Sequence, residues 1–72
     1  MLHPYEEAVL SLPEFWLAGK GDYVIDEIAA MTPAQAAFVV GAMVEHWTLK
    51  EGRQHDAARL LNALQRRAEE HA

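Results

Sequence analysis

The feature that most constrains this chain is the apolar run at residues 34–44, in which Gln35 is the only polar side chain. A helix that is apolar on every side is normally buried, because no face of it gains from contact with water. As an α-helix the run would be about 17 Å long, which is short of the roughly 30 Å hydrocarbon core of a bilayer. The run therefore predicts a buried central helix and argues against a membrane span.

The start of this central helix is strongly specified by the local sequence. Thr32 is a good N-cap, because its hydroxyl can accept a hydrogen bond from a backbone N–H that has no helical partner. Pro33 suits the first helical position, where its missing N–H is no loss. Gln35 completes a T-x-x-Q capping box. We therefore predict a helix over about 33–50.

Two stripes of different size run along the predicted central helix. They consist of the small residues Ala34, Ala37 and Gly41, and of the mostly larger residues Ala36, Val40, Met43 and Trp47. One apolar stripe is enough to pack a surface helix, so two stripes indicate two partners. A 72-residue chain also has a small core, to which its thirteen alanines add little buried area. We therefore expect a homodimer, with one of these stripes at its interface.

The first twenty residues contain signals for two short helices. Pro4 can open one that runs to about Leu10. Ser11 and Glu14 then match the S-x-x-E capping box, which predicts the start of a second helix. Glycine commonly ends helices, and Gly19 lies where this second helix would stop.

A third helix is predicted just before the central one. Asp22 can cap it, and it would run over about 23–30. Its core-facing residues would be Val24, Ile25 and Ile28. A strand at residues 23–25 would fit their propensity, but the sequence offers no second strand to pair with it.

The end of the chain is predicted to form an amphipathic helix over about 54–70. Its apolar residues recur at helical spacing and are Ala57, Leu60, Leu61, Leu64 and Ala68. Residues 50–56 before them have no apolar side chain. A continuous helix through Gly52 would keep the apolar period, but glycine costs about 1 kcal/mol in a helix interior. We favour a turn at Gly52 and an antiparallel hairpin.

A repeat-like spacing supports this hairpin. It is carried by Val44, Gly52, Ala57 and Leu61, with the turn glycine five residues before a helix alanine. This spacing resembles one helical hairpin of the tetratricopeptide repeat family and covers residues 44–64. Glu45 departs from the family pattern, and a stable solenoid needs at least about three repeats. The resemblance therefore implies a helical hairpin and not a repeat array.

Taken together, the helix signals predict an all-α fold. It is a small bundle of four to five helices around a buried central helix (about 33–50) paired with a C-terminal helix (about 54–70). One helical domain is expected over residues 1–72.

No spacing of residues indicates catalysis or metal binding. The chain has no cysteine, which removes disulfides, zinc–thiolate sites and thiol catalysis. Its four histidines form no H-E-x-x-H or E-x-x-H pattern. We interpret His46 as a capping or interface residue, with a pH-sensitive switch and a catalytic base as alternatives. We therefore expect no enzyme activity, cofactor, metal or small-molecule substrate.

The distribution of charge bears on the partners of the protein, and the N-terminal residues bear on its localisation. The net charge is −5, yet five of the six Lys and Arg residues lie within residues 50–67. Such asymmetry is typical of two halves that face each other in the fold or in a dimer, or of a partner surface. Residues 1–7 have neither a basic nor an apolar stretch, so we expect no signal peptide and a cytoplasmic protein.

By elimination, we predict a non-catalytic protein–protein interaction module. It would be a small acidic adaptor, regulator or inhibitor that occupies a surface of a larger protein. The alternatives are a nucleic-acid binder that uses the arginines of the C-terminal helix, and a small homo-oligomeric structural subunit. The candidate interface residues are Phe15, Trp16, Val40, Met43, Trp47, Arg59 and Arg66.

Two of these groups have a second interpretation. Phe15 and Trp16 would be core residues in so small a fold, or anchors of an interface if they are exposed. Arg59 and Arg66, with Arg67 beside them, form too small a basic patch in an acidic chain for nucleic acid. We expect no DNA or RNA binding. The arginines should instead meet acidic residues such as Glu6, Glu14, Asp26 or Glu27 of the same chain, of its copy or of a partner.

Overall fold

The computed structural model describes the backbone of residues 4–70 and the side chains of residues 7–70. The expected partner Glu6 lies outside the described side chains, and the expectation of no signal peptide rests largely on residues outside this range. The elements are α1 (Pro4–Leu17), α2 (Gly21–Ala29), α3 (Pro33–His46), the π-helical turn η1 (Trp47–Glu51) and α4 (Gln54–Glu70). The all-α prediction is confirmed for the described part of the chain.

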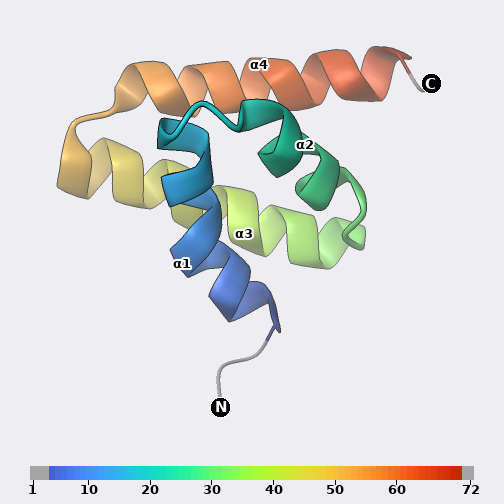
Figure 1. The fold of residues 1–72 in the computed structure, drawn as a ribbon, viewed down its shortest axis with the longest axis horizontal. Helices are drawn as coiled ribbons and strands as arrows, with labels where there is room; N and C mark the ends of the chain where they lie inside the picture. Colours follow the sequence, from blue (N-terminus) through green and yellow to red (C-terminus); the bar gives the residue numbers. More distant parts are fainter. Residues whose placement is uncertain (1–3, 71–72) are drawn as a thin grey trace.

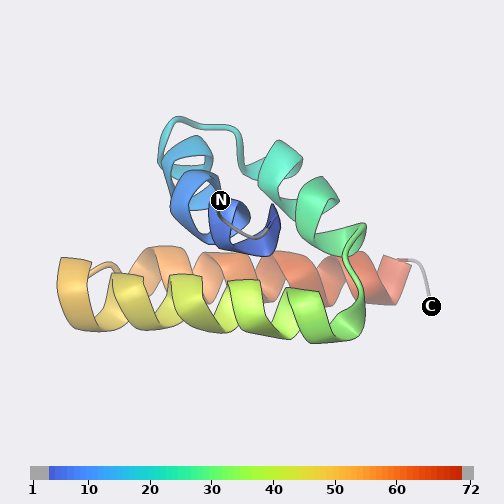
Figure 2. The same ribbon diagram turned by 90° about the horizontal axis from the view of Figure 1, so that it is seen from below.

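The helices form two layers. Figure 2 shows α3 and α4 side by side as an antiparallel hairpin, with α1 and α2 packed across one side of it. In Figure 1 the connection between α3 and α4 lies at the left, near α1. The core between the layers contains Leu12, Val24, Ile25, Ile28, Val39, Met43, Trp47, Ala57 and Leu60.

The N-terminal prediction of two short helices is wrong. One helix, α1, runs through Pro13. Ser11 caps nothing, because its hydroxyl donates to the carbonyl of Glu7, one turn back. Proline cannot donate to the carbonyl four residues before it, which usually interrupts a helix. Here Leu12, which is buried, holds the middle of the helix against the core.

The third predicted helix starts earlier than expected and is not capped by Asp22. α2 begins at Gly21, its N-cap is Lys20, and no side chain caps it. Asp22 lies instead in the first turn, where the helix dipole favours an acid. The predicted core residues of this helix are all buried: Val24, Ile25 and Ile28.

The predicted start of α3 is confirmed in detail. The backbone N–H of Gln35 donates to the Thr32 hydroxyl at 3.2 Å, and the N–H of Thr32 donates to the Gln35 side chain at the same distance. Pro33 is the first residue of the helix. The capping box is therefore complete, and local sequence alone explains where α3 begins.

Burial of α3 is confined to one side. Val39, Met43 and Trp47, four residues apart, face the core and are buried, whereas the stripe of small residues faces outward and is exposed. Phe38, on the outward side of α3, is 52% exposed. The prediction that α3 is buried all round is therefore too strong, because in the described part of the chain the other helices cover only one of its faces.

The chain breaks at Gly52, as predicted. Gly52 has a φ of +64°, in the left-handed region that favours glycine, and it ends the π-helical turn η1. The N–H of Arg53 donates to the carbonyl of Trp47 at 2.8 Å and helps close this turn. The hairpin implied by the repeat-like spacing is therefore present. Within the described residues, no helix combines the length and apolar character needed to cross a membrane.

Candidate docking groove

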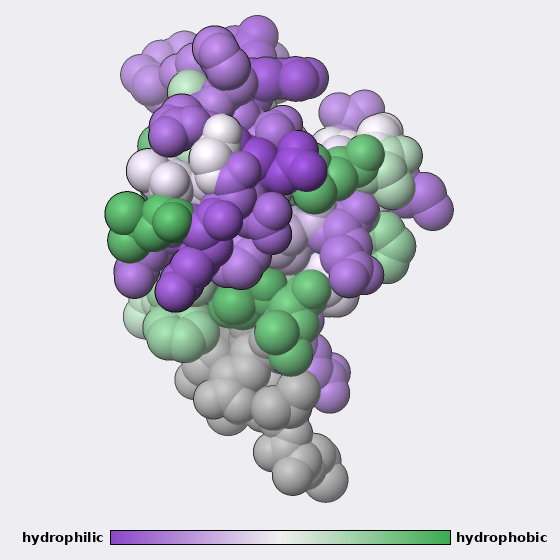
Figure 3. All heavy atoms as spheres, turned by 90° about the vertical axis from the view of Figure 1, so that its left-hand side faces the viewer, coloured by the Kyte–Doolittle hydropathy of each residue, from purple (hydrophilic) through white to green (hydrophobic). Residues whose placement is uncertain are grey.

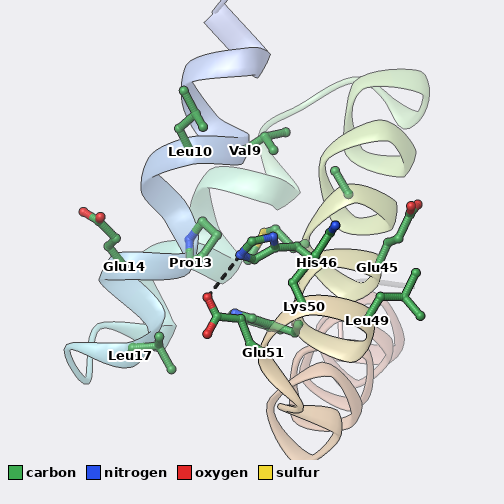
Figure 4. A pocket seen from close by; sticks show the side chains of 13 residues that line it. Val9, Leu10, Pro13, Glu14, Leu17, Glu45, His46, Leu49, Lys50 and Glu51 are labelled. Carbon is green, nitrogen blue, oxygen red and sulfur yellow. Dashed lines mark hydrogen bonds and ion pairs between the residues drawn. The ribbon is translucent and has the colours of Figure 1, made fainter.

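A groove of about 500 Å³ lies between α1 and the segment that joins α3 to η1. Its apolar lining includes Val9 and Pro13 from α1 and the edge of Met43 from α3. Figure 4 shows Pro13 next to His46 inside this groove, with the two helical walls on either side. Of the six large hydrophobic side chains that are exposed among the described residues, three line this groove.

Three leucines line this groove and are largely exposed. The exposed fractions are 63% for Leu10, 47% for Leu17 and 72% for Leu49. Leu10 and Leu17 belong to α1, and Leu49 lies on the opposite wall, in η1 (Figure 4). Figure 3, which views the side of the molecule with the α3–α4 connection, shows separate hydrophobic patches among hydrophilic side chains. Single exposed leucines are common, but several around one hollow mark a binding surface.

The helices explain why these leucines are left outside. Leu12 points into the core, so positions on the far side of α1 face away from it. Leu10 and Leu17 are seven residues apart, which places them two turns apart on one face of α1. Leu49 belongs to a turn in which Trp47 takes the core position. The backbone therefore holds all three leucines in place without burying them.

The π-helical turn also creates a polar pair within the groove. His46 Nε2 lies 3.3 Å from Glu51 Oε1, and both side chains are exposed. In a regular α-helix, residues five apart point about 140° away from each other, so this pair would not form. The wider π-helical turn brings the two side chains together (Figure 4). The structure thus places His46 in the wall of the groove.

The rim of the groove is predominantly acidic. Among the described side chains, three carboxylates line it, those of Glu14, Glu45 and Glu51, against one lysine, Lys50. Figure 4 shows Glu14 and Glu45 on opposite outer sides, pointing away from the centre of the groove. Each wall of the groove therefore carries an acidic side chain at its outer edge.

The predicted interface residues of α3 and η1 do not lie together on the surface. Met43 and Trp47 are buried in the core, so they pack the fold and leave no free face for a second copy. Val40 is half-buried and lines a second, apolar hollow of about 600 Å³ between α2, α3 and α4. The other proposed dimer surface, the stripe of small residues, remains exposed.

Phe15 and Trp16 are half-buried and pack against the core. The Phe15 ring meets Tyr23 edge to face, with 5.0 Å between centroids. Trp16 stacks at a tilt against Trp47, 6.0 Å away, and its Nε1 donates to Asp56 at 3.1 Å. These contacts join α1 to α2, η1 and α4, so the two residues serve packing first.

The arginines of α4 divide into two groups. Arg67 pairs with Asp26 of α2, as expected for an arginine that meets an acid of the same chain. Arg59 and Arg66 are exposed and make no ion pair with the described side chains. They line a third, polar hollow together with Arg53, Asp22 and other residues.

The sequence pattern did not point to the three leucines of the groove. Leu10 and Leu17 were assigned to two different helices, so their common face was hidden. Leu49 stands alone at the edge of the polar stretch that follows Trp47. The usable signal was the apolar spacing of α1, which continues without a break across Pro13 at residues 8, 9, 12, 15 and 16.

Among the described residues, no group of three or more histidine or acidic side chains is arranged to hold a metal ion. Among the described residues that line the groove, His46 and its partner Glu51 are both exposed. No protein-family model matches the chain, and neither the curated proteins nor the solved structures that were compared gave a match.

Proposed function

We propose that this chain is a non-catalytic protein–protein interaction module whose docking surface is the groove between α1 and η1. It would act in the cytoplasm as an adaptor, regulator or inhibitor. Its groove would bind a helix on the surface of a larger partner. The observation that carries this proposal is the position of Leu10, Leu17 and Leu49, which remain largely exposed around a single hollow.

The energetics of the groove suit such a role. Fully burying a leucine side chain contributes about 1.5–3 kcal/mol, so completing the burial of three partly exposed leucines contributes roughly 3–5 kcal/mol. A few apolar anchors of this kind dominate most protein interfaces. A groove between two helices is also the usual receptor for an amphipathic helix, which lays its apolar face into it.

Affinity capture with matched variants tests this proposal. The double variant Leu10→Gln/Leu49→Gln removes two apolar anchors without adding charge. Leu61→Gln is the control, because Leu61 is also exposed, at 47%, but lies on α4 and not in the groove. Circular dichroism would verify that all three proteins keep their helices.

The expected result is a set of captured proteins that is lost with the groove variant and kept with the control. A photo-crosslinker at position 49 should label the same protein, and one at position 61 should not. If both variants retain the same captured proteins, the groove is not the docking surface and the proposal fails.

A nucleic-acid binder is the second candidate, favoured by Arg59 and Arg66, which make no ion pair with the described side chains. The hollow beside these arginines also contains Asp22 and Asp56, which would repel phosphates. Binding to nucleic acid relies on a cluster of cations that neutralises several phosphates. This mixed surface therefore supports the second candidate less well than the groove supports the first.

A further inference from the structure

We propose that the partner segment is a basic amphipathic helix, with leucine-like anchors along one face and lysine or arginine on both flanks. The inference rests on the proposed docking function and specifies its ligand. It combines the placement of the three exposed leucines with the charges that surround them.

The spacing of the leucines sets the length of the ligand. Leu10 and Leu17 are separated by two helical turns of α1, about 10 Å along its axis. A helix lying beside α1 would match this distance with apolar residues at i, i+3 or i+4, and i+7. Leu49 lies at the outer edge of the opposite wall, beside Glu45, and would contact the bound helix from that edge (Figure 4).

The rim of the groove sets the charge of the ligand. Glu14 and Glu45 both line the groove, and Figure 4 shows them at the outer edges of its two walls, so each flank of a bound helix would lie beside a wall that carries a carboxylate. Glu51 adds a third acid, partly engaged with His46, and Lys50 is the one lysine in the lining. Complementary charges at a rim raise association rates and exclude like-charged partners.

A second copy of this chain fits the groove less well. Among the described residues, the exposed leucine outside the groove is Leu61, on α4. The neighbours of Leu61 one turn away include Ala58 and Gln65, and no lysine or arginine lies three or four residues from it. The copy would also carry the same net charge of −5. A partner with a basic helix satisfies the rim, and an anionic lipid surface does not.

Synthetic helical peptides test the charge of the ligand directly. Three peptides would share the same leucine face and differ only on the flanks, which carry lysine, glutamine or glutamate. Fluorescence anisotropy would measure their binding to the full chain. At about 50 mM salt the lysine peptide should bind about tenfold more tightly than the glutamine peptide, and the difference should shrink at about 500 mM salt, where screening is strong.

Matched charge variants identify the groups responsible. Glu14→Gln/Glu45→Gln should reduce the affinity of the lysine peptide to that of the glutamine peptide. Glu69→Gln/Glu70→Gln changes the net charge equally at the end of α4, away from the groove, and should leave the preference intact. Leu10→Gln/Leu49→Gln should weaken binding of both peptides.

Three results would overturn the inference. If the lysine and glutamine peptides bind equally and both depend on Leu49, the groove binds helices without charge selection, and only the docking function survives. If no peptide binds, the basic-helix ligand is wrong, whatever the capture experiment reports. If the chain sediments as a dimer that Leu49→Gln dissociates, a second copy is the occupant.

Discussion

Replacing Gly52 with alanine isolates the backbone conformation on which the hairpin depends. Gly52 has a φ of +64°, and a methyl group added there would have no heavy atom within 4 Å apart from its immediate chain neighbours. The substitution therefore creates no clash, and its cost comes from the left-handed conformation, about 1–2 kcal/mol for an L-residue. The stiffer unfolded chain offsets part of that cost, which leaves a net loss of about 1 kcal/mol.

Gly41→Ala is the matched substitution of opposite expected sign. Gly41 lies in α3, is exposed, and also has open space around the position of an added methyl group. In a helix interior alanine is favoured over glycine by about 0.5–1 kcal/mol. For a chain of this size, 1 kcal/mol corresponds to a Tm change of about 4–8 °C. The two variants should therefore move Tm in opposite directions.

The assay is urea and thermal unfolding followed by circular dichroism and by tryptophan fluorescence. The two probes should give the same midpoint if unfolding is two-state. A Gly52→Ala variant as stable as the parent, or more stable, would mean that residue 52 continues a helix. The favoured break would then be wrong, and the alternative of one long helix from α3 into α4 would hold.

Three further predictions follow from burial and charge. Trp47→Ala should lose roughly 3–5 kcal/mol of stability, because Trp47 is 1% exposed, and Phe38→Ala should lose less than about 1 kcal/mol, because Phe38 is 52% exposed. Equal losses of stability for the two variants in urea unfolding would contradict the assigned core. Mixed-sequence DNA and RNA should show no binding at about 150 mM salt by anisotropy, and micromolar affinity that Arg59→Glu/Arg66→Glu removes would promote the nucleic-acid candidate. The chain should form a dimer through the exposed stripe of small residues, and Ala37→Glu should dissociate this dimer. Sedimentation at micromolar concentration that shows an 8 kDa species alone would refute the prediction.

Some features that depend on neighbouring residues were predicted correctly, whereas the cap at Asp22 and the helix start at Ser11 were not. The capping box of Thr32 and Gln35 forms as its spacing requires, because both hydrogen bonds join residues within one turn. The break at Gly52 likewise reflects a local preference of glycine. The helical period of α2 identified its buried residues, since periodicity alone fixes which face can reach the core.

The candidate site could not be predicted in the same way. Its two walls come from α1 and η1, which are far apart in the sequence and meet only because both pack against the same core. The π-helical geometry that pairs His46 with Glu51 is likewise not visible in a pattern with an α-helical period. Which leucines remain exposed depends on this packing and not on their hydrophobicity.

The local sequence by itself determined where α3 begins, where the hairpin turns and which class of fold results. Only the tertiary structure decided that α1 continues through Pro13, where packing of Leu12 outweighs the lost hydrogen bond. It also decided that α3 is covered on one face alone. The physical reason is the same in both cases: burial depends on how many helices are available to cover a surface, and no single segment of sequence contains that information.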